Sequence, residues 1–278
     1  MEIQKQCGHY SEFQDEQFYF RPTYGKIEFD GERFNIIKSK EKKADFYPVS
    51  FLHNSLKTRL RFLNLANRYH KQNDRHLNIG SGLCDYEVFL SQLPIKLYSI
   101  EHPNSPALKE DVTRRNIQAS RSQLSTADIA EARLPFEDNF FDSVSFLEVI
   151  EHLPIEKLPF VVSEISRVLK KQGYLYLSTP NLASLENRLL LMFKAKLFFF
   201  IPQKKEETMF EHLRTYTNNE IRQVFVNFKI IEEIFFTDTI TWRTKASFLN
   251  IIQSCLIKLL IKLNKNFNNS FIFVMQKN

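Results

Sequence analysis

The sequence predicts an α/β fold with a mostly parallel sheet and helices on both faces, and three observations lead to it. Short apolar runs that suit buried strands alternate with helical patterns from His76 to Ser178. Glycine or acidic residues follow several of these runs, as they do at the ligand-binding edge of open α/β sheets. The chain has 278 residues, 43% hydrophobic and 25% charged, a composition typical of a soluble globular protein.

The net charge and the cysteine content limit the kinds of partner and cellular compartment that we expect for this chain. The net charge of +6 permits anionic partners, but lysine and arginine are spread along the chain, which is typical of a solvated mixed surface. The three cysteines, Cys7, Cys84 and Cys255, form no CxxC pair, which favours a reducing cytoplasm. The first residues lack an apolar signal region, and no uncharged apolar stretch reaches about 18 residues, so we expect no spanning helix.

The N-terminal part precedes the alternating core. Residues 1–48 are polar, charged and aromatic without a clear period, which indicates an N-terminal extension. A helix is predicted over residues 50–70, because leucines recur there at helical spacing with basic residues between them. These leucines are Leu52, Leu56, Leu60 and Leu63.

The core, residues 49–182, is predicted to hold five strands and the helices between them. The strands are expected over residues 76–80, 96–101, 122–127, 143–147 and 174–178. Short helices are expected over residues 86–93 and 108–117. A longer helix is predicted over residues 155–171, with one apolar stripe, basic residues in its last turn and Gly173 just beyond it. Repeated strand–helix–strand units of this kind predict parallel pairing.

After Asn181 the pattern changes, and two further parts are predicted. Residues 183–211 form an apolar insertion, expected as a helical lid, and residues 212–278 complete the core. The elements expected there are a helix over 218–226, strands over 229–236 and 271–275, and an amphipathic helix over 248–263. Thr217 is a plausible N-cap for the first of these helices.

A glycine turn and an acidic residue at neighbouring strand ends indicate a cofactor site. Gly80-Ser81-Gly82 follows a predicted strand and precedes a helix, so its backbone can approach a ligand at the helix N-terminus. Glu101 ends the next strand, about 20 residues on, where a carboxylate accepts hydrogen bonds from ribose hydroxyls. A tight structural turn and a solvated glutamate are the alternatives, and the two features together favour a nucleoside-type cofactor.

These residues and three further segments resemble class I S-adenosylmethionine-dependent methyltransferases over about residues 76–278. LNIGSG resembles the family's first motif, Glu101 its ribose-binding acid, and Asp128-Ile129 the pair that recognises adenine. GYLYLSTPN and HLRTYTNNEI resemble its last core strand and the segment before its final helix. The resemblance implies a Rossmann-like, doubly wound fold of seven mostly parallel strands with an antiparallel last strand, and S-adenosyl-L-methionine as cofactor.

By the same resemblance, cofactor-binding roles are assigned to residues along the strand ends. They are Asn78, Gly80, Ser81, Gly82, Glu101, Asp128, Ile129 and Leu147. Two departures from the family pattern are visible. Asn78 replaces the usual aspartate, which removes a charge, and Cys84 stands where a third glycine is common. The first turn also lacks a full GxGxxG, which weakens a nicotinamide interpretation.

A cluster of potential ligands follows the strand predicted over residues 143–147. Glu148, Glu151 and His152 allow three interpretations: they begin a helix, His152 acts as a general base, or the cluster holds a metal. With the distant His212 they resemble the Glu-x-x-Glu-His pattern of small-RNA 2′-O-methyltransferases, partly shared by ubiquinone-pathway O-methyltransferases. A divalent ion there would lower the pKa of an acceptor hydroxyl, and magnesium, manganese and zinc suit such ligands about equally.

The expected function is methyl transfer to oxygen of a small, lipid-linked or glycan acceptor, with His152 as the catalytic residue. The apolar segments 185–201 and 248–263 are expected to pack as a cap over the acceptor, or to contact the inner membrane face through snorkelling lysines. A non-catalytic binding or scaffold protein is the first alternative. RNA methylation is the second, although we expect no nucleic-acid partner because no RNA-binding module or basic–aromatic patch is present.

Overall fold

The computed structural model describes residues 21–39, 47–51, 53–194, 212–237 and 259–278, and within them a seven-stranded sheet forms the core. Its strands are β4 (Arg75–Ile79), β5 (Lys96–Glu101), β6 (Gln123–Thr126), β7 (Phe141–Leu147), β8 (Leu169–Pro180), β9 (Phe228–Phe236) and β10 (Ser270–Lys277). The order across the sheet is β6-β5-β4-β7-β8-β10-β9. The first five strands in this order run parallel, whereas β10 is antiparallel to both β8 and β9. The predicted mostly parallel sheet with an antiparallel last strand is confirmed.

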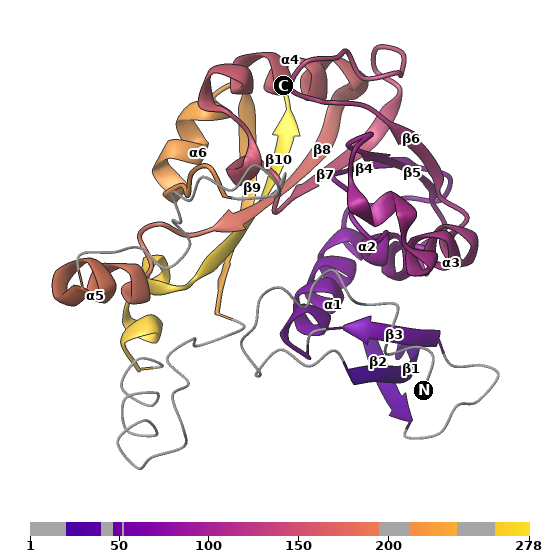
Figure 1. The fold of residues 1–278 in the computed structure, drawn as a ribbon, viewed down its shortest axis with the longest axis horizontal. Helices are drawn as coiled ribbons and strands as arrows, with labels where there is room; N and C mark the ends of the chain where they lie inside the picture. The colour runs from indigo at the N-terminus through magenta and orange to yellow at the C-terminus, as the bar shows by residue number, and fades with distance from the viewer. Residues whose placement is uncertain (1–20, 40–46, 52, 195–211, 238–258) are drawn as a thin grey trace.

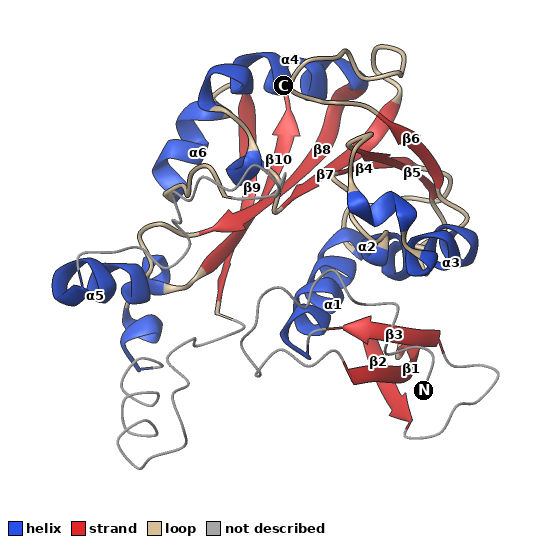
Figure 2. Cartoon of the chain, in the orientation of Figure 1, coloured by secondary structure: helices blue, strands red, loops and turns tan. Residues whose placement is uncertain are grey.

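Helices cover both faces of this sheet, as Figure 1 and Figure 2 show. The helices are α1 (His53–Asn67), α2 (Asp85–Leu90), α3 (Asp111–Ser120), α4 (Leu158–Val168), α5 (Leu185–Lys194) and α6 (Asn218–Val224). Short 3-10 helices span Pro106–Lys109, Ile150–His152, Ile155–Lys157 and Lys265–Phe267. Buried side chains from α4 and α6 form one apolar core with the sheet, and those from α1 and α2 form a second core. Apolar burial in these two cores is the main force that stabilises the fold.

A three-stranded antiparallel sheet packs beside α1, in a region where the sequence shows no clear period. Its strands are β1 (Arg21–Phe29), β2 (Phe34–Ser39) and β3 (Tyr47–Phe51), in the order β2-β1-β3. The Asn64 side chain on α1 accepts a hydrogen bond from Phe34 N and donates one to Phe34 O. Buried Phe34 also joins the core around α1, so the small sheet is fixed to the rest of the chain (Figure 1).

The helix predicted over residues 155–171 ends earlier than expected, at Val168. Leu169 already pairs with β7 as the first residue of β8, and the register between the two strands then shifts. Gly173 lies in the resulting bulge, where an added Cβ would come within 2.8–2.9 Å of backbone oxygens on both strands. This glycine therefore permits a strand bulge, and the prediction that it ends a helix was wrong.

The C-terminal part follows the prediction where the structure describes it. α6 begins with a capping box, in which Thr217 Oγ1 accepts from Glu220 N and the Glu220 carboxylate accepts from Thr217 N. The predicted apolar segment 185–201 is helical over α5, and residues 195–201 lie outside the described part. The predicted helix over 248–263 is described, and is helical, from residue 259 onward. Among the described residues no helix is long and apolar enough to cross a membrane.

Candidate functional site

The glycine turn lies directly after β4, at the carboxyl edge of the sheet. Gly80 N and Ser81 N donate hydrogen bonds to Ile100 O on β5, at 2.9 and 3.1 Å. Gly80 and Gly82 have φ angles of +74° and +53°, in the left-handed region where larger residues are strained. A Cβ added at Gly82 would meet nothing within 4 Å, so open space lies beside the turn for a ligand.

The carboxylate of Glu101 faces this turn from the neighbouring strand. Glu101 is buried, and its two oxygens accept hydrogen bonds from Gly82 N and His102 N. His102 Nε2 lies 3.4 Å from Asp128 Oδ2, just beyond β6. The structure thus brings together Gly82, Glu101 and Asp128, three predicted cofactor-binding residues, from the ends of three strands.

The other predicted cofactor-binding residues surround this group. Ile129 packs against the main core while partly buried, and Leu147 is buried at the end of β7. Ser81 is buried within the glycine turn. Asn78 is also buried, and its amide donates to Glu87 and accepts from a serine on β7, so both of its polar atoms already have protein partners.

Helices α1 and α3 hold the segment that follows the turn. Asp85 begins α2 and accepts hydrogen bonds from Arg59 at 2.9 Å and from Asn116 at 3.1 Å. Asn116 also donates to Leu83 O at 2.8 Å. Cys84 has a φ of +57° and is buried, and burial raises the pKa of its thiol. The cysteine that stands where the resemblance led us to expect a third glycine is therefore a buried, unreactive part of the turn.

A second group of polar side chains lies beyond β7. Glu148 has a φ of +55°, and Ser178 Oγ donates to its carboxylate at 2.6 Å. Glu151 is fully buried and accepts from Thr179 Oγ1 at 3.0 Å through Oε2. No donor among the described residues reaches Glu151 Oε1. Burial raises the pKa of Glu151 well above its ordinary value, and the neighbouring Glu148 carboxylate raises it further.

The side chains of His152 and His212 lie close to Glu151. The backbone N–H groups of Leu213 and Arg214 donate to Glu151 O, which holds the segment carrying His212 against the turn. The rings of His152 and His212 lie edge to face, with centroids 4.7 Å apart. One carboxylate oxygen of Glu151 and one nitrogen of each ring all lie within 4.8 Å of one another. Burial, assisted by His152, lowers the pKa of His212 to about 4, so its ring is neutral near pH 7 and offers a lone pair.

The glycine turn is in contact with the chain segment that carries this acidic group. A Cβ added at Gly80 would come within 2.4 Å of Val149 Cγ2, so the turn packs directly against the chain between Glu148 and Glu151. Of the four predicted metal ligands, three converge, whereas Glu148 is engaged by Ser178. The arrangement can place a bound cofactor beside groups that accept a proton or hold a cation.

Three polar residues of the site were not predicted from the sequence. Glu87 is buried beneath the glycine turn, His102 lies beside Asp128, and Thr179 donates to Glu151. No clear sequence signal marked the first, because Glu87 stands near Asp85 in the first turn of a short helix, where acidic residues are common. The other two adjoin residues that the sequence did indicate.

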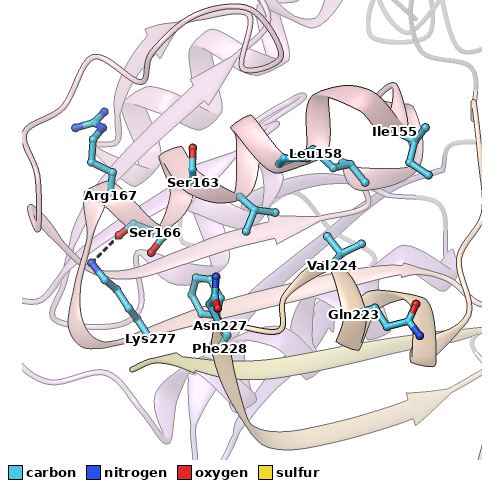
Figure 3. A pocket seen from close by; sticks show the side chains of 12 residues that line it. Ile155, Leu158, Ser163, Ser166, Arg167, Gln223, Val224, Asn227, Phe228 and Lys277 are labelled. Carbon is cyan, nitrogen blue, oxygen red and sulfur yellow. Dashed lines mark hydrogen bonds between the residues drawn. The ribbon is translucent and has the colours of Figure 1, made fainter.

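A groove of about 720 Å³ lies elsewhere, between α4 and α6. Figure 3 shows Ile155, Leu158 and Val224 along it, and Lys277 donating to Ser166 O at one end. None of the predicted site residues lines this groove. The lysine donates to Ser166 O in the last turn of α4 and to Leu169 O just beyond it, which is a stabilising contact at a helix C-terminus.

Comparisons with known proteins agree with this arrangement. Residues 77–177 match a family model described as a methyltransferase domain, and a search of curated proteins finds no match. A SAM-dependent methyltransferase from Archaeoglobus fulgidus is similar at TM-score 0.54 and 15% identity, over 81% of this chain and 94% of that one. One from Methanosarcina mazei is similar at TM-score 0.53 and 17% identity, over 77% and 96% of the two chains. At these identities the likeness shows a shared fold.

Proposed function

We propose that this chain, whose residues 77–177 match a methyltransferase domain, is a class I S-adenosylmethionine-dependent methyltransferase. We propose further that it methylates a hydroxyl oxygen of a small, lipid-linked or glycan acceptor. One observation carries the proposal. Gly82, Glu101 and Asp128 lie together, and the glycine turn packs at Gly80 against Val149, two residues before Glu151, so groups suited to a nucleoside adjoin the segment that carries groups suited to a hydroxyl. Such adjacency is what transfer between two bound molecules requires.

The residues around the glycine turn fit S-adenosyl-L-methionine. The space at Gly82 gives a ligand access to the backbone, and Glu101 would accept hydrogen bonds from ribose hydroxyls. Asp128 would accept from the adenine amine while Ile129 packs on the ring. The remaining assigned residues are Asn78, Gly80, Ser81 and Leu147. The bound cofactor supplies a methyl group that is already activated on a positively charged sulfur.

We assign the proton transfer to His152. A hydroxyl must lose its proton as its oxygen takes the methyl group, and an imidazole accepts protons near neutral pH. His152 lies at the carboxyl edge, in the short helix beside the glycine turn. His152→Gln is expected to lower kcat by roughly 10²-fold while cofactor affinity changes little.

A divalent cation held by Glu151, His152 and His212 is a second way to activate the same hydroxyl. Carboxylate and imidazole ligands suit magnesium, manganese or zinc, and Glu151 Oε1 has no donor among the described residues. A bound ion would lower the pKa of the acceptor hydroxyl. Chelation should then abolish activity, metal should restore it, and Glu151→Gln should prevent the restoration. Activity that survives chelation would leave His152 to act without metal.

Exposed apolar side chains near the carboxyl edge support a lipid-linked acceptor and contact with the cytoplasmic face of a membrane. α5 follows β8, and its Leu191 and Met192 are 49% and 67% exposed. Leu259 and Leu263 are 56% and 74% exposed. We expect the protein to co-sediment with anionic vesicles and a Leu191→Asp/Met192→Asp variant to bind them less. Wild-type protein that stays in the supernatant removes the membrane part of the proposal.

Incubation of the purified protein with methyl-labelled cofactor and fractionated cell extract tests the reaction itself. We expect label in one chemical class of acceptor, and a large loss of that label with His152→Gln. Wild-type protein that binds the cofactor but labels no fraction would favour the non-catalytic binding protein. Label in RNA would replace the acceptor that we propose.

A further inference from the structure

Glu87 forms a hydrogen-bonded bridge inside the protein, directly beneath the glycine turn. Its side chain is fully buried on α2. One carboxylate oxygen, Oε1, accepts a hydrogen bond from Asn78 Nδ2 at 2.8 Å and another from Ser99 Oγ at 2.7 Å. Asn78 and Ser99 are register partners on the parallel strands β4 and β5. A single oxygen from the helix therefore ties the two strands together.

The two strand residues that Glu87 binds lie just before the cofactor-binding groups. Asn78 precedes Gly80 by two residues on β4, and Ser99 precedes Glu101 by two residues on β5. The Glu101 carboxylate in turn accepts from the backbone of the glycine turn. Two sets of hydrogen bonds thus set the distance between the glycine turn and the Glu101 carboxylate. One joins Gly82 N directly to Glu101, and the other joins Asn78 and Ser99, on the two strands, to Glu87.

We propose that Glu87 is a positioning residue for the cofactor, which fixes the separation between the glycine turn and Glu101. The inference rests on the proposed function, because it takes Gly82 and Glu101 as the groups that bind the cofactor. Glu87 acts through its two strand partners and touches neither reactant. Binding geometry set in advance lowers the ordering that a ligand would otherwise have to impose.

The bridge also explains why residue 78 is an asparagine. Asn78 donates to Glu87 through Nδ2 and accepts from Ser145 Oγ through Oδ1 at 2.7 Å. A carboxyl group in its place would still accept from Ser145, but it would lose the amide N–H that donates to Glu87 and would put a second acid beside it. The acidic side chain that the family pattern places on β4 therefore lies on α2 in this chain, as Glu87.

Ser99 extends the same network across the sheet. Its hydroxyl lies 2.6 Å from Ser122 Oγ, next to β6, while Asn78 reaches Ser145 on β7. Side-chain hydrogen bonds consequently join β5, β4 and β7 with the residue just before β6. Glu87 Oε2 has no hydrogen-bond partner among the described residues, so the bonds that converge on Oε1 alone favour this arrangement of the strands.

Calorimetric titration with S-adenosylhomocysteine, the demethylated form of the cofactor, tests the proposal. Glu87→Leu removes the hydrogen-bond acceptor for Asn78 and Ser99 and should weaken the affinity for S-adenosylhomocysteine at least tenfold. Glu87→Gln keeps a carbonyl oxygen for both donors and should retain most of the wild-type affinity. In a Glu101→Gln background the Glu87→Leu effect should shrink, because the positioned carboxylate is already altered. A general loss of folding would not produce this dependence on Glu101.

A charge exchange keeps the test decisive if Glu87→Leu fails to fold. Asn78→Asp should weaken binding, and Asn78→Asp combined with Glu87→Gln should recover it, since the new amide can donate to the new carboxylate. Glu186→Gln is the matched control, as Glu186 is a partly buried carboxylate on α5 whose pKa burial raises to about 7. It should leave affinity unchanged.

The outcomes separate the two proposals. Wild-type protein that does not bind S-adenosylhomocysteine contradicts the proposed function, whatever the variants do. Wild-type binding together with unchanged affinity in a folded Glu87→Leu variant overturns the positioning role. Where that variant does not fold, failure of the charge exchange to recover affinity overturns it instead.

Discussion

Replacement of Glu87 by glutamine should change how the stability of the protein depends on pH. Burial raises the pKa of Glu87 from 4.5 to about 7, and hydrogen bonds from Asn78 and Ser99 limit the rise. The folded chain therefore holds a proton on this group between pH 4.5 and 7 that the unfolded chain has released. Stability from this group is present below pH 4.5 and is lost as pH rises toward 7.

The magnitude follows from the interval between the two pKa values. At 1.36 kcal/mol per pKa unit, the rise from 4.5 to about 7 corresponds to about 3 kcal/mol, most of it between pH 5 and 8. Urea unfolding of the wild type and of Glu87→Gln at pH 5, 6, 7 and 8 measures the effect. The free energy of unfolding of the wild type should fall relative to the variant by about 2–3 kcal/mol across this range.

The exposed Glu137→Gln variant controls for the loss of one carboxylate, and we expect it to track the wild type at every pH. A difference between wild type and Glu87→Gln that stays constant from pH 5 to 8 would refute the reasoning. It would show that the buried carboxyl group ionises in the folded chain as it does in the unfolded one.

Three further predictions follow from local geometry. Gly80→Ala forces a left-handed φ on alanine and a clash with a valine side chain at 2.4 Å, so it should lower the free energy of unfolding by about 2–4 kcal/mol in urea. Thr217→Ala removes the capping box of α6 and should lower the thermal unfolding midpoint, with a loss of about 1 kcal/mol. In a variant lacking Cys7 and Cys255, Cys84 should react with a thiol reagent at pH 8 only after urea is added. The reason is that Cys84 is buried and burial raises the pKa of its thiol. Rapid labelling of the native protein would contradict this prediction.

The alternation of short strand-like and helical segments in the sequence was sufficient to predict the seven strands of the main sheet. β7 is buried along most of its length and its residues are mostly apolar or small, so its pattern is visible without tertiary information. β4 and β5 keep a core of apolar residues around buried polar ones such as His76 and Asn78. β1 and β2 mix charged, polar and apolar residues, and no such pattern marks them. Their attachment depends on Asn64 of α1, a contact that local sequence does not encode.

The candidate site was predictable to the extent that its residues adjoin strand ends. Glycine and acidic residues after β4, β5 and β7 indicated the carboxyl edge, and the structure places them there. The family resemblance, and not spacing, joined His212 to His152. Glu87 could not be assigned because a helical glutamate is usually solvated, and its burial depends on donors from two strands that meet only in the folded sheet.

Binding of S-adenosylhomocysteine to the wild type and to a Glu101→Ala variant, measured by titration calorimetry, tests the central claim most directly. The account predicts one site per chain and at least a tenfold loss of affinity in the variant, because Glu101 supplies the acceptor for the ribose hydroxyls. The absence of heat with wild-type protein at millimolar ligand, or equal affinity of the two proteins, would contradict it.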